Sequence, residues 1–278
     1  MSSSEFHALK PHDYIRQVVE DDIGIILQPE KDYLIHNRLG PILRKHELRD
    51  LQELVRHLHG NKLQGLREEV AQAFATGETF FFRDRFPFDA CEEFILPDLI
   101  QKREKRKTLT IWSVGCSTGQ EPYSVAILLQ EKFPQLVTWN VRIIAIDLSE
   151  AFLDRARLGQ YSTFEINRGL PSRYKEEYFT GIESDTWELK DATRKRVEFE
   201  QFNLIAPWPV LANPDFVFLR NVLIYFSEET KRNILKKVER ILAPDGYLLL
   251  GSSENLLHQE SSLEQVTFGR TICYRQPG

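Results

Sequence analysis

The sequence predicts an all-helical domain at the N-terminus, followed by a larger α/β domain that carries a small antiparallel β insertion. Apolar residues recur at helical spacing up to about residue 75, and no strand pattern appears before about residue 108. Beyond that point, short apolar β-rich runs alternate with amphipathic helices. This alternation is typical of a mostly parallel sheet that is covered by helices on both faces.

The helical domain is expected over residues 1–75. Within 14–19, 51–58 and 66–74, apolar side chains recur three or four positions apart, as on the buried face of a helix. The following stretch, "TGETFFFRDRFPF", shows no clear period. We therefore predict that residues 76–88 form a linker between the helical domain and the α/β domain.

The α/β domain is expected over residues 89–278. Its predicted strands are "LTIWSV", "NVRIIAI", "FVFL", "GYLLLG" and "RTICYR", and helices are predicted from Pro122 to about Lys132 and from about Glu150. A polar stretch at roughly residues 162–202, with "DTWELKD" and "RVEFEQF", interrupts the rhythm and is predicted to be the antiparallel insertion. Parallel sheets bind their ligands at the carboxyl ends of the strands.

The composition excludes several classes of protein. The 278 residues carry a net charge of −5, which argues against a protein that coats nucleic acid or an anionic membrane. The apolar runs are too short to cross a bilayer, and the start lacks the apolar core of a signal peptide. Three scattered cysteines without a CxxC pair disfavour structural zinc and suggest a reducing compartment. We expect a cytoplasmic protein that binds no metal.

The stretch "WSVGCSTGQEPYS" supports two interpretations. Its letters match G-x-S-x-G, the turn that presents the nucleophile of a serine hydrolase, here Ser117. His258, preceded by Asp215 or Asp245, would complete the required chain order. The helical character of the preceding residues disfavours the hydrolase, because that fold has strands before its nucleophile. The alternative is a strand-to-helix turn that holds a cofactor.

The residues around this turn favour a cofactor with a positive region. No lysine follows Gly119, so the turn is not a P-loop, and the glycine spacing does not match G-x-G-x-x-G. Glu121 would repel a pyrophosphate but attract an amino group or a sulfonium. Asp147 ends the next strand, where an acid accepts hydrogen bonds from ribose hydroxyls. Together these features suit S-adenosylmethionine.

Seven stretches carry a more specific signal: "TGETFFFRD", "WSVGCSTGQEPYS", "AIDLSEAFLDRAR", "NRGLP", "FEQFNL", "FLRNVLIYF" and "LAPDGYLLLGSSENL". In this order and spacing, the chain resembles the CheR-type chemoreceptor glutamate O-methyltransferases over nearly its whole length. The resemblance implies a Rossmann-like class I SAM-dependent methyltransferase domain with a small β-subdomain. It also implies transfer of a methyl group from S-adenosylmethionine to glutamates of methyl-accepting chemotaxis receptors, leaving S-adenosylhomocysteine.

The resemblance assigns roles residue by residue. The implied residues at the methionine end and the ribose are Thr79, Arg83, Glu121 and Asp147, and those around the adenine and the cleft are Asn203, Leu204, Arg220 and Asn221. Arg83, which would orient the acceptor carboxylate, and Tyr225, which would face the substrate, are the implied catalytic residues. One departure is Gly77, since the family often has asparagine there and any contact from that side chain is lost.

The implied partner is a glutamate-rich receptor helix, which an acidic enzyme needs a locally basic surface to bind. Arg38, Arg44 and Lys45 lie where the resemblance implies a receptor-facing helix, although they can equally be ordinary solvated charges. The compact loop "FTGIESDTWEL" disfavours docking on a receptor tail, and we expect a monomer. A non-catalytic adaptor that binds cofactor or receptor is the other open function, and the Gly77 departure leaves room for it.

Overall fold

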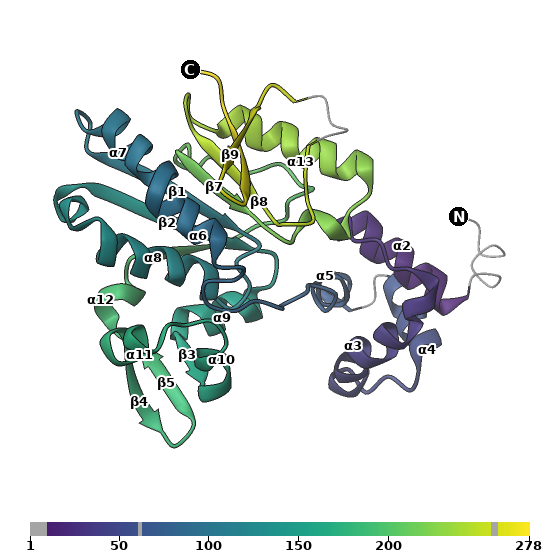
Figure 1. The fold of residues 1–278 in the computed structure, drawn as a ribbon. Helices are drawn as coiled ribbons and strands as arrows, with labels where there is room; N and C mark the ends of the chain where they lie inside the picture. The colour runs from purple at the N-terminus through teal and green to yellow at the C-terminus, as the bar shows by residue number, and fades with distance from the viewer. Residues whose placement is uncertain (1–9, 61–62, 257–260) are drawn as a thin grey trace. The chain divides into compact units, whose positions relative to one another are not determined.

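The computed structural model describes residues 10–60, 63–256 and 261–278. The chain forms two compact units (Figure 1). The first consists of Met1–Thr76 together with Tyr225–Lys231, and the second of Gly77–Ile224 together with Arg232–Gly278. The predicted linker is therefore no free connector, because from Gly77 onward it belongs to the second unit.

The first unit is helical, as the sequence predicts. Its elements are α2 (Pro11–Ile23), η1 (Pro29–Lys31), α3 (Asp32–Lys45), α4 (Leu51–His59) and α5 (Leu66–Gln72). Helix α2 buries Ile15, Val18 and Val19 along one face, which is the periodicity seen in the sequence. Helix α4 begins where the Asp50 carboxylate accepts a hydrogen bond from the Glu53 N–H, an N-cap that satisfies one free donor.

A short segment from far along the chain completes the first unit. The N–H of Ile26 donates to the carbonyl of Tyr225 at 3.0 Å, and Ile25 forms an isolated antiparallel bridge with Phe226. No sequence pattern suggested this pairing, since it joins residues about two hundred positions apart. As a result, the implied catalytic residue Tyr225 belongs to the helical unit.

The second unit is built on a seven-stranded sheet of order β6-β2-β1-β7-β8-β10-β9. The strands are β1 (Thr108–Val114), β2 (Asn140–Asp147), β6 (Val197–Gln201), β7 (Phe216–Leu219), β8 (Tyr247–Leu250), β9 (Glu264–Phe268) and β10 (Thr271–Arg275). The first five in the spatial order run parallel, and β10 is antiparallel to both of its neighbours. The carboxyl ends of five strands therefore meet along one edge.

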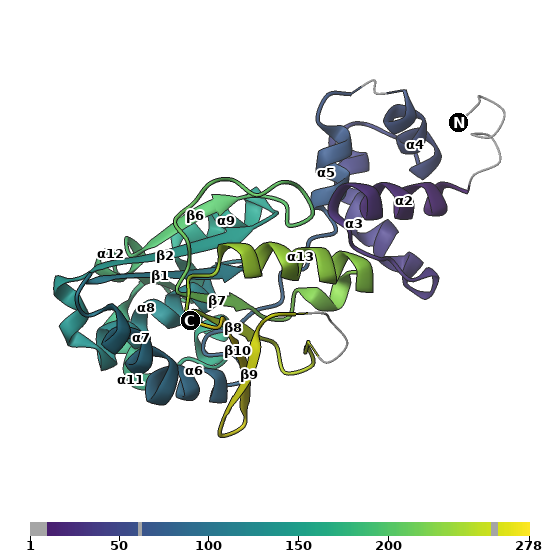
Figure 2. The ribbon, with the colours of Figure 1, turned by 90° about the horizontal axis from the view of Figure 1, so that it is seen from above.

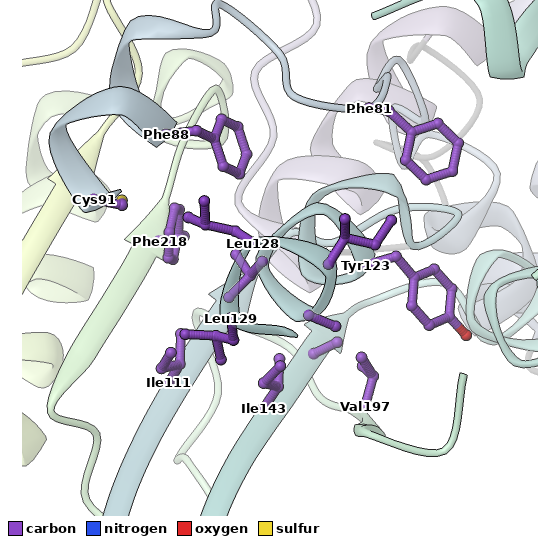
Figure 3. Close-up of a cluster of buried hydrophobic side chains, with 14 of the residues drawn as sticks. Phe81, Phe88, Cys91, Ile111, Tyr123, Leu128, Leu129, Ile143, Val197 and Phe218 are labelled. Atoms are coloured by element: carbon purple, nitrogen blue, oxygen red, sulfur yellow. The ribbon is translucent and has the colours of Figure 1, made fainter. Parts of the chain in front are cut away.

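Helices cover both faces of this sheet, with α7 and α8 on one side and α13 on the other (Figures 1 and 2). The helices of this unit are α6 (Phe86–Ala90), η2 (Cys91–Ile95), α7 (Leu96–Arg103), α8 (Gln120–Lys132), η3 (Pro134–Thr138), α9 (Glu150–Leu158), α10 (Thr163–Asn167), α11 (Ser172–Tyr178), α12 (Asp191–Arg194), η4 (Leu223–Tyr225, with its last residue in the first unit) and α13 (Glu228–Ile241, with Glu228–Lys231 in the first unit). The buried cluster in Figure 3 joins Ile111 and Phe218 of the sheet to Leu128 of α8 and Phe88 of α6. Burying each such side chain stabilises the fold by roughly 1.5–3 kcal/mol.

The antiparallel insertion is confirmed, but its extent was predicted wrongly. A three-stranded antiparallel sheet of order β3-β5-β4 contains β3 (Gln160–Ser162), β4 (Phe179–Glu183) and β5 (Thr186–Leu189). The run "RVEFEQF" does not belong to this sheet. It contains β6, which pairs parallel with β2 so that Val197 lies opposite Ile143 and Gln201 lies opposite Asp147. This run alternates charged and apolar residues, as a solvated hairpin does. An edge strand of a large sheet is also half exposed and therefore shows the same pattern. Strand β9 is also mostly exposed, so its sequence lacks the apolar run that would have predicted a strand.

Asp215 anchors the opposite edge of the sheet, just before β7. One of its oxygens accepts from Arg103 Nε at 2.8 Å and also pairs with Arg106. The other oxygen accepts from the N–H of Thr110 at 2.9 Å. Both Asp215 and Arg103 are buried, so their pairing offsets part of the cost of removing both charges from water.

We predict that Asp215→Ala destabilises the second unit by about 3–5 kcal/mol, because it leaves the Arg103 guanidinium buried without its partner. Urea unfolding followed by circular dichroism measures this loss. The matched control is Asp191→Ala, which removes an exposed carboxylate from Arg194 and Lys195. The control should leave the stability nearly unchanged, because solvent screens an exposed ion pair. A loss at Asp215 as small as that at Asp191 would contradict the assignment.

Candidate functional site

The candidate site lies where β1, β2 and β7 end side by side. The glycine turn, residues 115–119, follows β1 and leads into α8. Gly115 has a φ of 72°, and a Cβ there would lie 2.3 Å from Val222, so only glycine fits. Gly119 has a φ of 95° and precedes the first residue of α8. The chain reverses sharply here and leaves the helix amides facing the edge of the sheet.

Asp147, at the end of β2, stabilises this turn through hydrogen bonds to backbone N–H groups. One carboxylate oxygen accepts from the N–H of Ser117 at 2.8 Å, and the other accepts from the N–H of Ser149 at 3.0 Å. Burial raises the pKa of Asp147, while the N–H groups of Ser149 and Ser117 oppose the shift. The predicted ribose acceptor therefore also holds the turn in shape, a second role that the sequence did not reveal.

The turn has no activated nucleophile. The Ser117 hydroxyl donates to the carbonyl of Gly77 at 3.0 Å, and burial raises the pKa of the Cys116 thiol. Asp215 and Asp245 precede β7 and β8, so they lie at the sheet edge opposite Ser117. His258 lies outside the described residues. The geometry of the acids argues against the serine hydrolase.

Arg220, directly after β7, connects the parts of the site. Its side chain is 1% exposed, and Nη1 donates to Glu121 Oε2 at 3.0 Å. Nη2 donates to Asp84 Oδ2 at 2.8 Å and to the carbonyl of Arg83 at 3.0 Å. The other Glu121 oxygen accepts from the Ser113 hydroxyl at 2.9 Å. Glu121 is thus held in a fixed orientation at the start of α8.

The three consecutive phenylalanines of "TFFFR" have different surroundings. Phe81 is fully buried, with its ring edge-on to those of Tyr161 and Phe179. Phe82 packs against Phe88, and its N–H donates to the Ser124 hydroxyl at 2.9 Å. Phe80 stays partly exposed. Aromatic packing therefore ties the predicted linker to the second unit.

Arg83 lies in a strained turn. Phe82, Asp84 and Arg85 all have positive φ angles, of 49°, 67° and 49°. Such conformations cost non-glycine residues on the order of 1–3 kcal/mol each and persist only where surrounding contacts hold them. The partly exposed Arg83 side chain donates from Nη1 to the carbonyl of Glu78 at 2.9 Å. The neighbouring implied residue, Thr79, is also partly exposed.

A lysine organises the loop predicted to flank the adenine. Lys237 of α13 donates from Nζ to the carbonyls of Leu204, Ile205 and Ala206 at 2.8, 2.9 and 2.8 Å. The Asn203 side-chain oxygen accepts from the N–H of Ile205 at 3.1 Å. The sequence did not mark Lys237 as a site residue, because a lysine on an amphipathic helix usually faces solvent. Desolvation lowers its pKa.

The charge and hydrogen-bonding capacity of the site suit S-adenosylmethionine. The Oδ1 atom of Asn221 is buried, and no partner for it occurs among the described residues. A buried acceptor of this kind requires a donor, which the ammonium of the methionine portion can supply. Glu121, at the start of α8, adds a carboxylate to the site, and one of its oxygens is paired with Arg220. Within the described ranges, no group of three or more His, Cys, Asp or Glu side chains could hold a metal ion.

The residues expected to meet a receptor belong to the first unit. Arg38 is partly buried and donates to the carbonyls of Ala73 and Ala75 at 2.9 and 2.6 Å. Burial lowers its pKa, and the Tyr225 side chain opposes that shift. Arg38 is therefore engaged inside the unit, contrary to the view of it as a surface cation. Lys45 pairs with Glu69 at 2.9 Å, and Arg44 is exposed.

Comparison with known families matches both parts of the chain. Residues 77–272 match the model of the CheR methyltransferase, SAM binding domain. Residues 13–75 match the CheR methyltransferase, all-alpha domain. No helix of the described residues is long and apolar enough to cross a membrane.

Curated relatives match over nearly the whole length. Chemotaxis protein methyltransferase 1 of Pseudomonas aeruginosa is 40% identical over 264 residues, covering 94% of this chain and 95% of the relative. Chemotaxis protein methyltransferase Cher2 of Pseudomonas putida is 38% identical with the same coverage. Among solved structures, the N-methyltransferase NodS of Bradyrhizobium japonicum with S-adenosyl-L-homocysteine is 14% identical, covering 71% of this chain and 91% of that chain with a TM-score of 0.38.

We predict that Ser117→Ala leaves the chemistry of the site largely intact, because the hydroxyl makes one hydrogen bond to a backbone carbonyl. Removing that bond should cost roughly 0.5–1.5 kcal/mol of stability. Adenosylhomocysteine binding by calorimetry and labelling with a fluorophosphonate probe test this. Stoichiometric labelling of Ser117 in the parent protein would contradict this prediction and support the serine hydrolase interpretation.

A second prediction concerns Gly77. A Cβ at this position would lie 2.7 Å from Cζ of Phe152, so Gly77→Ala forces that ring to move. We expect a loss of about 1–3 kcal/mol in the free energy of unfolding, typical of overpacking. Introducing Phe152→Leu together with Gly77→Ala should recover part of it, as a double-mutant cycle in urea would reveal. Strictly additive effects would show that the two positions do not compete for space.

Proposed function

The chain belongs to the CheR methyltransferase family, and we propose that its acceptors are glutamate side-chain carboxylates of chemoreceptors. It is a chemotaxis methyltransferase that depends on S-adenosylmethionine. The reaction we propose converts the glutamate to its methyl ester and releases S-adenosylhomocysteine. Tyr225 and Arg83 are the residues that we assign to the acceptor, and the edge of the parallel sheet is the part that we assign to the cofactor.

The observation that carries this proposal is the way Arg83 is held. Its backbone lies in the strained turn, and its carbonyl accepts a hydrogen bond from Arg220. The N–H of the preceding residue, Phe82, donates to the Ser124 hydroxyl. Because Arg220 also binds Glu121, the turn that presents Arg83 and the glycine turn share one buried connection. A guanidinium presented in this manner can bind both oxygens of a carboxylate in one orientation.

The chemistry needs orientation more than proton transfer. When bound, S-adenosylmethionine supplies a methyl group activated by the sulfonium. The acceptor carboxylate is already ionised at neutral pH, since the pKa of a glutamate is about 4.3 in model peptides, so no general base is required. Arg83 would align one face of the carboxylate, and the Tyr225 hydroxyl would donate to an oxygen. Correct alignment of reacting groups can contribute several kcal/mol to the rate.

The cofactor contacts that we propose follow the chemistry of each side chain. Glu121 and Asn221 accept from the ammonium, and Asp147 accepts from the ribose hydroxyls. Asn203 and Leu204 border the adenine, and this is supported by the way Lys237 holds their loop. Thr79 would lie towards the methionine end, and Arg220 would act by orienting Glu121.

We further propose that the enzyme works as a monomer in the cytoplasm and uses no metal. For the receptor, Arg44 and Lys45 remain the proposed contacts in the first unit, whereas Arg38 is supported only as an internal residue. The alternative of a non-catalytic adaptor predicts adenosylhomocysteine binding without methyl transfer. Radiolabelled S-adenosylmethionine with receptor-containing membranes separates the two functions.

We predict that Arg83→Ala retains most of its affinity for S-adenosylhomocysteine but loses methyl transfer by a hundredfold or more, because it removes alignment. Arg83→Lys should rescue poorly, since a point charge cannot reproduce the planar two-pronged contact. Tyr225→Phe should be milder, at roughly 0.5–1.5 kcal/mol for one hydrogen bond. Calorimetry and transfer of radiolabel measure the two quantities separately.

The control for Arg83 is Arg142→Ala, which removes a partly exposed arginine paired with Glu198 near the start of β2. This variant should bind the cofactor and methylate receptors like the parent. If Arg83→Ala folds normally and methylates at the parental rate, Arg83 has no part in aligning the acceptor.

A further inference from the structure

The loop that follows α10, within "NRGLP", lies directly against the turn-forming linker. Gly169 has a φ of 97°, and a Cβ there would lie 2.1 Å from the carbonyl oxygen of Phe81 and 3.0 Å from the Phe80 ring. Any larger residue would push the two segments apart. The neighbouring N–H of Arg168 donates to the carbonyl of Phe164 at 3.1 Å. Position 168 is thus fixed beside the linker by backbone contacts on both sides.

From this position, Arg168 reaches the same residues as Arg83. Its Nη2 donates to a Glu78 carboxylate oxygen at 2.9 Å, whereas Arg83 donates to the Glu78 carbonyl at 2.9 Å. The guanidinium carbons of Arg168 and Arg83 lie 4.6 Å and 5.6 Å from the centre of the Phe80 ring. Both distances are within the range of a cation–π contact. We call Arg83 and Arg168 the arginine pair; Phe80 is the ring that both of them contact.

Among the described residues, the two positive charges of the arginine pair have one carboxylate partner, Glu78. Glu78 is the carboxylate that pairs with Arg168, and Arg83 is bound there by a carbonyl, which carries no net charge. The pKa of Glu78 is lowered mainly by its hydrogen bond to Arg168, and the charge of Arg83 contributes. The side chain of Arg168 is 42% exposed, so it remains accessible. A second carboxylate arriving here would meet donors already oriented by Glu78.

We propose that Arg168 is a second substrate-binding residue, which holds a carboxylate neighbouring the glutamate that Arg83 aligns. This inference rests on the proposed function. Glutamates three or four residues apart lie on the same face of a helix, with their Cβ atoms about 5–6 Å apart. Arg83 and Arg168 contact the same Phe80 ring, so their guanidinium groups lie close enough together to bind two such neighbouring side chains. The substrate class is therefore a helix with paired acidic residues, and Arg168 selects for the second acid.

The experiment measures methyl transfer by the full-length protein to receptor-containing membranes. Arg168→Ala should raise the KM for receptor about three- to tenfold, as expected for a partly exposed charge contact, with little change in kcat. Its affinity for S-adenosylhomocysteine should stay at the parental value, since no proposed cofactor residue touches Arg168. Arg168→Lys should recover part of the KM because the charge remains, and raised salt should narrow the difference from the parent.

A change on the receptor gives the decisive test. Replacing the glutamate one helical turn from the methylated position by glutamine should raise the KM of the parent enzyme but not that of Arg168→Ala. Arg173→Ala is the matched control, because it removes another exposed arginine from the neighbouring helix α11. It should respond to the receptor change like the parent.

The outcomes separate the two proposals. If the parent binds S-adenosylhomocysteine but transfers no methyl group, the proposed function is wrong. If the parent is active and Arg168→Ala shows the parental KM, the inference alone is overturned. Equal sensitivity of the parent and Arg168→Ala to the receptor change would also overturn it. Should Arg168→Ala lose stability, comparing Arg168→Lys, which keeps the charge, with Arg168→Gln, which is neutral and shorter, applies the same criteria.

Discussion

The buried guanidinium of Arg220 is the interaction on which the candidate site depends. It holds Glu121 at the start of α8, Asp84 in the strained turn, and the carbonyl of Arg83. Buried ion pairs add little net stability compared with apolar packing, but losing one partner costs about 3–5 kcal/mol. The value of this group therefore lies in geometry, since it joins Glu121 and the turn that carries Arg83, the residues that we propose for the cofactor and the acceptor, in one network.

Strain is concentrated in the same region and is balanced by nearby contacts. Ser117 and Asn221 have φ angles of 52° and 59°, in addition to the three positive angles around Arg83. Each strained residue is held by a specific bond, as Asp147 holds the N–H of Ser117 and Glu254 holds the N–H of Asn221 at 2.7 Å. Backbone that is over-determined in this way stays in place when ligands arrive, which is what an alignment mechanism requires.

Much of the site could be predicted because its residues follow strand ends in a recognisable order. Glu121 and Asp147 were predicted from their places after two strands, and Arg220, which follows a third strand, from the family resemblance; parallel pairing brings these strand ends together. Lys237 carried no such signal, and the quoted stretches that contain Glu254 and Arg168 did not single out these two residues. Their contacts join segments distant in sequence, and an amphipathic helix or a polar loop offers no pattern that marks one charged residue among many.

The sequence by itself determined the fold class and the family, because periodicity and motif spacing are local properties of the chain. It also led to Glu121 and Asp147 as the proposed acids of the cofactor site. Only the tertiary structure decided that "VEFEQ" joins the main sheet, that Arg38 bonds to the carbonyls of Ala73 and Ala75, and that Tyr225 belongs to the helical unit. These outcomes depend on which buried donors and acceptors find partners after folding. The partners are far apart in the chain and meet only in the folded protein, so the local sequence around each residue does not reveal which partner it finds.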